Sequence, residues 1–417
     1  MGEQKKILGY NRNVFMLGLV SLFTDLANEI ILRTIPLFLA NVLGVRTSII
    51  GLVEGVAEST ATVLKIFSGW FSDLTGKRKP LTVLGYGLSS LSKPFLYFAG
   101  SWPAVLMIRF FDRVGKGIRT SPRDALIADS SAPGEIGKAF GLHRTLDPLG
   151  AVIGTALAGF LVLWGQKGTI LMSGTTFRYL VLMSLIPAAI SVILLVVGVR
   201  EPDKPVCFKE SGGENQRYKW WELKGYRQGF PAFLFINVIF TLGNSSDAFL
   251  VLRAQKLGTP LAGIFFLLAV FNIVSSLLAL PAGRLSDRLG RKKLLVFGWL
   301  LYSLVYLGFA YARTSWQVWV LYSLYGAYYG ITDGVARAFV ADMVNRERRG
   351  TAYGLYNMAV GVSALPASLA AGILWDRFGS PAPFIFGAIL ALAATVGLTV
   401  FVGGSLPDAN PPCQDPK

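Results

Sequence analysis

The amino-acid sequence predicts an all-α membrane protein, with twelve transmembrane helices in two pseudo-symmetric six-helix bundles. Three observations lead to this prediction. The 417 residues are 53% hydrophobic and only 15% charged, whereas a soluble domain carries about 25% charged residues. Apolar runs of about 20 residues, long enough to cross a bilayer as a helix, recur along the chain. Motifs of the first half return in the second half at an offset of 213 or 214 positions.

The candidate helices follow the apolar runs in chain order. The first set covers 13–40, 48–69, 81–100, 104–127, 139–164 and 178–199. The second set covers 230–255, 261–283, 294–312, 316–340, 351–375 and 381–403. We therefore expect an N-terminal bundle at 1–199, a cytoplasmic linker at 200–229, a C-terminal bundle at 230–404 and a cytoplasmic tail at 405–417. The linker is either an amphipathic segment at the membrane surface or a solvated tether.

Basic residues in the loops predict the orientation, because they favour the cytoplasmic side. One side holds the larger set, namely Lys5, Lys6, Arg12, Lys77–Lys79, Lys138, the linker cations, Arg288–Lys293, Arg346, Arg348 and Arg349. The other side holds only Arg46, Lys167, Arg178, Lys256, Arg313 and Arg377. Both termini are therefore expected in the cytoplasm, and the protein in the plasma or inner membrane. This bias explains the net charge of +16, so we expect no nucleic-acid partner.

Reactive residues are too few to predict an enzyme. His143 is the only histidine, and the two cysteines, Cys207 and Cys413, fall on the expected cytoplasmic side. The sequence contains no nucleophile–histidine pair, metal-ligand cluster or phosphate-binding glycine loop. We therefore expect no catalytic centre, no metal site, no disulfide and no cofactor.

Two similar turns organise the chain, GWFSDLTGKRK at 69–79 and GRLSDRLGRKK at 283–293, which is 214 positions later. The first glycine of each lets a helix approach its neighbour, and the second permits a turn with positive φ. The aspartate can accept hydrogen bonds from a helix N-terminus or pair with an arginine. The basic cluster marks the cytoplasmic side.

The pattern G-x-x-x-D-x-x-G-[RK]-[RK] between spans resembles the signature loop of the major facilitator superfamily, which joins that family's second and third helices. Members commonly carry a weaker copy between helices eight and nine, where the second turn lies. The first copy departs from the pattern at Leu74, whereas the second keeps Arg288. The resemblance covers about 13–403 and is closest to the twelve-helix drug–proton antiporters.

The resemblance also implies a gate on the cytoplasmic side. Asp73 would hold it shut by pairing with the fourth helix and with the eleventh near Gly350–Thr351. Asp129 would contact the first basic cluster and Asp342 the second, and breaking these contacts would be part of opening inward. The expected gating residues are Gly69, Asp73, Gly76, Lys77, Arg78, Asp129, Gly283, Asp287, Gly290, Arg291 and Asp342.

Charged residues inside the spans mark candidate sites, because a charge at mid-membrane costs about 2.5–3.5 kcal/mol. In the first span, Asp25, Glu29 and Arg33 share one helical face. In the second span, Glu54 and Glu58 lie one turn apart and are expected to share a proton. The expected proton-coupling residues are Asp25, Glu29, Glu58 and Asp112.

The fourth span is the most densely charged. By position, Arg109 matches the arginine that antiporters place in this helix beside the proton path, although Arg113 stands where that family has glycine. The fifth span carries Asp147–Pro148 where antiporters tend to have glycine and proline. The expected substrate-binding residues are Asn28, Arg33, Arg109, Arg113, Arg144, Asp147, Asn244 and Asp247.

The repeat favours the N-terminal bundle as the place of coupling, because the second half has uncharged residues at the positions equivalent to Arg119, Arg144 and Asp147. Structural alternatives stay open for several groups. The first-span charges also suit a buried ion network, and the arginines of the fourth span suit neutralisation of Asp112. Lys93 suits an outward, snorkelling position. The same choice between lining a cavity and packing applies to Tyr322, Tyr325, Tyr328 and Tyr329.

These features predict a proton-coupled secondary transporter that works by alternating access and exports small organic molecules. Its expected partners are a small-molecule substrate, protons and the lipid bilayer, and it is expected to be a monomer. The alternative is a proton-coupled uptake symporter for an anionic solute or a metal chelate, because the arginines favour anions.

Overall fold

The computed structural model describes residues 6–75, 77–131, 136–166, 168–201, 229–344 and 349–402. Within its helices, the side chains of residues 66, 73, 75, 136–138, 144 and 349–351 are outside this description. Most of the expected linker and tail, with both cysteines, also lies outside the described residues, as does Gly76. The described part begins with a short antiparallel hairpin of β1 (Lys6–Ile7) and β2 (Tyr10–Asn11), and the rest is dominated by helices.

The helices divide between the two halves of the chain. Those of the first half are α1 (Arg12–Ile31), η1 (Leu32–Thr34), α2 (Ile35–Asn41), α3 (Thr47–Thr75), α4 (Arg78–Ser92), η2 (Lys93–Phe98), α5 (Trp102–Asp129), α6 (Ile136–Gly165), α7 (Gly174–Ile193) and the π-helical η3 (Leu194–Gly198). Those of the second half are α8 (Phe230–Gly243), α9 (Ala248–Lys256), α10 (Leu261–Leu289), α11 (Arg291–Tyr311), α12 (Ser315–Asp342), α13 (Arg349–Phe378) and α14 (Ala382–Phe401).

Every predicted apolar run is largely helical. Eight stretches of the described chain are long and apolar enough to cross a membrane by length and composition, namely 12–41, 139–165, 174–198, 230–256, 261–289, 291–311, 352–378 and 382–401. The other four predicted runs are helical as α3, α4 with η2, α5 and α12, but they do not reach that threshold. Among them, α3, α5 and α12 supply charged and tyrosine side chains to the cavity described below.

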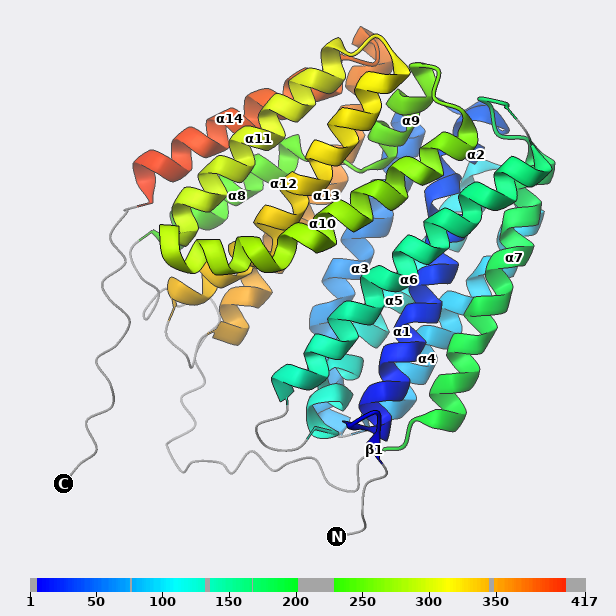
Figure 1. Ribbon diagram of the computed structural model, residues 1–417, viewed down its shortest axis with the longest axis vertical. Coiled ribbons are helices and arrows are strands. Elements are labelled where there is room, and N and C mark those ends of the chain that lie inside the picture. Colours follow the sequence, from blue (N-terminus) through cyan, green and yellow to red (C-terminus); the bar gives the residue numbers. More distant parts are fainter. Residues whose placement is uncertain are drawn as a thin grey trace.

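The two halves repeat the same helix pairings. In the first half, α1 packs on α6 and α7, and α5 packs on α3 and α4. In the second half, α8 packs on α13 and α14, and α12 packs on α10 and α11. The halves meet where α3 packs on α13 and α6 packs on α10, which is again a symmetric pair of contacts. Figure 1 shows α11, α14 and α8 on one side and α1, α4 and α7 on the other.

The first long helix of each half is broken near its middle. In the first half, α1 passes through η1 into α2, where Pro36 lacks the N–H that a continuous helix would use. In the second half, the chain leaves the helix at Asn244 and resumes it at Ala248, whose N–H donates to Ser246 Oγ at 3.3 Å. The sequence predicted one uninterrupted span in each place. The breaks expose polar backbone and side chains at the centre of the molecule.

Among the described residues, the halves are in contact from one end of the molecule to its middle. We call the end with Thr75–Arg78 and Leu289–Arg291 the turn end. At the opposite end, the backbone N–H groups of Thr47 and Ser48 donate to the Asp376 carboxylate at 3.0 and 2.9 Å. Towards the turn end the halves diverge, as Figure 1 shows below α2 and α9.

Glycines on α3 and α13 make this close contact possible. A Cβ added at Gly55 would lie 2.9 Å from Leu365 Cα, and one added at Gly372 would lie 2.6 Å from Ser48 Cα. On the same α13, a Cβ added at Gly354 would meet nothing within 4 Å. The interface is therefore tight from the opposite end to the middle of the molecule and open beyond it.

Candidate functional site

A cavity of about 530 Å³ lies between the two halves. The first half contributes residues of α1, η1, α2, α3, α5 and α6, and the second half contributes residues of α8, α9, α12, α13 and the α8–α9 break. Most of the predicted site residues line it, namely Asp25, Asn28, Glu29, Arg33, Glu58, Arg109, Arg113, Asn244 and Asp247. The sequence thus brings most of its candidate binding and coupling residues to one place.

Arg33 connects the two halves across this cavity. Its Nε lies 3.2 Å from Glu29 Oε2, and its Nη1 lies 3.0 Å from Asp247 Oδ2. The hydroxyl of Tyr325 donates to the other oxygen of Asp247 at 2.9 Å. Both Arg33 and Asp247 lie at helix breaks, so the two broken helices meet through a chain of charged hydrogen bonds.

Helices α3 and α5 are joined by two successive ion pairs. Arg109 Nη2 lies 2.6 Å from Glu54 Oε2, and Arg113 Nη2 lies 3.2 Å from Glu58 Oε1. The carboxylates are four residues apart and so are the arginines, so the two pairs are consecutive rungs between the helices. The expectation that Glu54 and Glu58 share a proton is wrong, because each faces an arginine of α5 instead.

Asp112 lies on α5 between Arg109 and Arg113 in the sequence, but it does not line the cavity. It accepts a hydrogen bond from Ser89 Oγ at 2.6 Å, and Lys93 Nζ lies 3.6 Å from its Oδ1. The side chain of Lys93 is only 1% exposed, so the snorkelling position considered from the sequence is not adopted. Asp112 therefore neutralises a buried lysine and lies 3.9 Å from both Arg109 and Arg113.

A smaller cavity of about 260 Å³ contains Asp25 and Asp147 together, beside Pro148. Asp147 accepts a hydrogen bond from Ser21 Oγ, and His143 Nε2 lies 3.8 Å from it. Asp25 lines both cavities. The side chain of Arg144, also expected here, lies outside the described residues.

The wall formed by the second half is largely uncharged. Tyr325 and Tyr329 line the central cavity, as one of the two interpretations from the sequence expects. Tyr322 and Tyr328 pack in the aromatic core, as the other interpretation expects. Tyr302 donates from its hydroxyl to Gly243 O at 3.0 Å and supports the α8–α9 break. Sequence reasoning missed the place of Lys116 in the cavity lining, although its position seven residues after Arg109 puts both on one face of α5.

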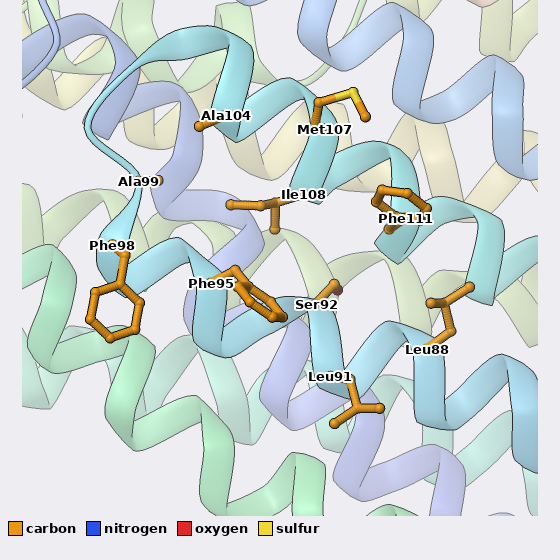
Figure 2. A pocket seen from close by; sticks show the side chains of 10 residues that line it. All are labelled: Leu88, Leu91, Ser92, Phe95, Phe98, Ala99, Ala104, Met107, Ile108 and Phe111. Atoms are coloured by element: carbon orange, nitrogen blue, oxygen red, sulfur yellow. The ribbon is translucent and has the colours of Figure 1, made fainter.

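A third hollow, of about 500 Å³, lies on α4, η2 and α5 (Figure 2). Its lining is apolar except for Ser92, and Leu91, Phe95 and Phe98 are all more than half exposed. Such a surface suits contact with lipid chains, and the Ser92 hydroxyl in its lining already donates to Ser89 O at 2.8 Å. The charged central cavity is therefore the candidate functional site.

The expected gating residues form contacts within each half. Arg78 Nε lies 2.8 Å from Asp129 Oδ2, and Arg291 Nη1 lies 2.6 Å from Asp342 Oδ1. Arg291 also lies 3.4 Å from the exposed Asp287. The contacts expected for Asp129 and Asp342 with the basic clusters are therefore present, and their breaking during opening stays a prediction. They fasten neighbouring helix ends of the same half.

The glycines of the two turns differ from each other in their surroundings. Gly290 has a φ of +93°, as predicted for the second glycine of its turn. A Cβ added at Gly69 would lie 3.4 Å from Ser121 Cβ, whereas one added at Gly283 would meet nothing within 4 Å. Lys77 is exposed. Gly76 and the side chain of Asp73 lie outside the described residues.

Comparison with known proteins gives concordant results. The chain is 34% identical over 392 residues to an uncharacterized MFS-type transporter, MJ1317, of Methanocaldococcus jannaschii, which covers 92% of this chain and 93% of that protein. It is 25% identical over 337 residues to the multidrug resistance protein MdtG of Serratia proteamaculans, with 78% of each chain covered.

Solved structures of transporters share the fold. A mutant of the nucleoside transporter NupG superposes with a TM-score of 0.77 at 12% identity, covering 94% of this chain and 100% of the other. A D-xylose–proton symporter superposes with a TM-score of 0.76 at 16% identity, covering 94% and 98%. The family model of the Major Facilitator Superfamily matches residues 17–253 and 232–414. The chain therefore belongs to the Major Facilitator Superfamily.

Proposed function

We propose that this protein is a proton-coupled secondary transporter that works by alternating access and exports small organic molecules. One observation carries the proposal. A charge-lined cavity lies at the interface between two similar halves, and it is closed at one end by contacts between them and open towards the other. Rocking of the two halves about this interface would expose the same cavity to either side of a membrane in turn.

The proposal includes a specific topology. All twelve predicted runs cross the membrane, including the four that carry more polar side chains. The turn end faces the cytoplasm, because the basic clusters of both turns lie there. The structure then corresponds to an inward-open state of a monomer in the plasma or inner membrane, with bundles at 1–199 and 230–404.

Coupling to protons is assigned to carboxylates of the first half. Protonation of Glu29 would weaken its hold on Arg33, which lies 3.2 Å away and also pairs with Asp247 of the other half. Protonation of Asp25 would remove a charge from both cavities. Either change alters the charge at the interface between the halves and so biases their relative position.

Export of drug-like molecules is supported by the relatives. MdtG is named a multidrug resistance protein. A tetracycline resistance protein, class C, of Escherichia coli is 32% identical over 126 residues, which is 30% of this chain. The aromatic wall of Tyr325 and Tyr329 beside charged groups suits molecules that combine an apolar body with ionised groups.

The alternative is uptake by symport of an anionic solute or a metal chelate. Its support is the pair Arg109 and Arg113, whose Nε atoms are buried without a hydrogen-bond partner beside the cavity. The similarity in fold to a D-xylose–proton symporter is compatible with this direction.

Proteoliposomes containing the protein and a pH-sensitive dye test the proposal. With an imposed pH gradient, we expect a transported drug-like molecule to dissipate the gradient, and we expect Asp25→Asn to abolish this response. Dissipation by anionic solutes moving in the same direction as protons would favour the symport alternative. If no compound in a broad panel moves protons or is itself moved, the proposal fails.

A further inference from the structure

Two charged side chains of the central cavity form no ion pair with any residue that the structure describes. Each arginine of the lining is paired with a carboxylate, as described above. Asp25 on α1 and Lys116 on α5, by contrast, form no ion pair and no side-chain hydrogen bond within the part of the chain that the structure describes. The cavity therefore presents one free carboxylate and one free ammonium group, from two different helices.

Beside each free charge lies a buried hydrogen-bonding atom without a partner. Asn28 Oδ1, an acceptor, follows Asp25 by three residues. Arg113, whose side chain is 7% exposed, precedes Lys116 by three residues, and its Nε has no hydrogen-bond partner and lies 3.9 Å from Asp112 Oδ2. One turn further, Arg109 Nε also has no hydrogen-bond partner. Residues three or four apart lie on one face of a helix. Helix α1 therefore offers acceptors to the cavity, and α5 offers donors.

We infer that the cavity takes a zwitterionic small molecule, with its cationic group at Asp25 and Asn28 and its anionic group at Lys116 and Arg113. The inference rests on the proposed function, because it names the substrate class of the same cavity. The body of the molecule lies between these groups, near Tyr329, in a space of about 530 Å³ that suits a small organic compound.

The physical reason lies in the closure of the cavity. While the turn end is open, water solvates Asp25 and Lys116. When both ends are closed, this water is lost, and a charge without a partner in the membrane interior is costly. A zwitterion neutralises both groups at once. A cation leaves the charge of Lys116 without a partner, and an anion leaves the charge of Asp25 without one. Singly charged molecules therefore favour closure less.

Matched sets of probes test the inference on the full-length protein in detergent. Each set contains an amino acid, its methyl ester and its N-acetyl derivative, so that size stays similar while charge becomes zwitterionic, cationic or anionic. The sets use phenylalanine, leucine, 4-aminobutyric acid and 6-aminohexanoic acid, which vary the distance between the two charges. Binding is measured by isothermal titration calorimetry.

In at least one set we expect the zwitterion to bind, and both derivatives to bind at least about tenfold more weakly, because each loses one charged hydrogen-bonding contact. The inference is overturned if no zwitterion of any set binds. It is equally overturned if, in every set whose zwitterion binds, the ester or the N-acetyl derivative binds as tightly as its parent.

Two variants separate recognition from a merely structural role. Asp25→Asn should remove the preference for the zwitterion over the N-acetyl derivative, and Lys116→Gln should remove the preference over the ester. This crossed pattern is not expected from general loosening of the fold, which would weaken all three probes alike. Asp333→Asn and Arg337→Gln are the matched controls, because this pair is half exposed on α12 outside the cavity lining.

Failure of this inference is distinguishable from failure of the proposed function. The binding measurement needs no membrane and no pH gradient. Binding of zwitterions without any proton movement in proteoliposomes would keep the inference and contradict proton coupling. Proton-coupled movement of a singly charged molecule that binds as tightly as its zwitterionic parent would support proton coupling and contradict the inference.

Discussion

Arg33 and Asp247 form an ion pair across the interface between the two halves, with Nη1 3.0 Å from Oδ2, and they are 214 positions apart in the chain. The two turns have the same separation. Both residues lie where the first long helix of their half is broken. Equivalent positions of the repeat therefore carry opposite charges and meet at the centre of the molecule.

Loss of this pair should weaken the closed end. The side chains are 26% and 33% exposed, so we expect Asp247→Asn to shift the balance between the two states by only about 0.5–1 kcal/mol, or up to about fivefold. The measurement is the rate at which a membrane-impermeant thiol reagent labels a cysteine placed at Ser48. The background has Cys207 and Cys413 replaced. An unchanged labelling rate would contradict a latching role.

A pair of glycine substitutions on the interface helices should have opposite effects. We expect Gly55→Ala to lower the thermal stability of the detergent-solubilised protein, by about 1–3 kcal/mol, because the new Cβ meets the backbone of Leu365. Gly354→Ala should raise it by up to about 1 kcal/mol, since helix propensity improves and nothing lies within 4 Å. Equal shifts would show that the α3–α13 contact is not tight in solution.

Removal of one partner from the buried Glu54–Arg109 ion pair should lower the stability of the protein. Glu54→Gln leaves Arg109, which is 2% exposed, without its closest counter-ion, so we expect destabilisation of about 3–5 kcal/mol. The double variant Glu54→Gln with Arg109→Met should recover most of this loss. Thermal unfolding followed by intrinsic fluorescence makes the comparison, and Asp333→Asn serves as the exposed control. A double variant less stable than the single one would argue against a direct pair.

The ion pair at the turn end should affect stability without affecting the state of the cavity. Because Arg78 and Asp129 stay paired in the open structure, we expect Arg78→Gln to lower the melting temperature but to leave thiol labelling at Ser48 unchanged. Altered labelling would instead support the expectation that this pair is part of the gate.

The topology is open to a direct check. Cysteines placed at Lys79 and Lys293 should react with membrane-impermeant reagents from the same side of the bilayer, because both follow equivalent turns. Inside-out vesicles should label both and right-side-out vesicles neither. Labelling from opposite sides would contradict the duplicated arrangement and the transport cycle built on it.

The sequence was sufficient to predict the helices, because apolar runs of membrane-spanning length leave little freedom in placement. It could not predict the breaks. The run 230–255 is apolar enough to pass as one span, and only the polar residues Asn244 to Asp247 hint that the helix stops there. Pro36 gave a clearer signal in the first half, since proline in a helix removes a hydrogen bond.

The candidate site was predicted as a set of residues but not as a set of pairs. Spacing placed Glu54 beside Glu58 on one helix face, and a shared proton followed from treating that helix alone. The structure places α5 against the same face, so each carboxylate has its own arginine. Which helix packs on which is a property of the whole fold, and single-helix periodicity does not contain it.

The contact between the two broken helices also bears on how such a chain can be assembled. Two identical six-helix copies arranged about the same axis would bring arginine to arginine, or aspartate to aspartate, where this protein has an attraction, and like charges at such distances repel. The central contact therefore requires two copies that have diverged at this position. A homodimer of either half alone would lack the ion pair that joins the two halves here.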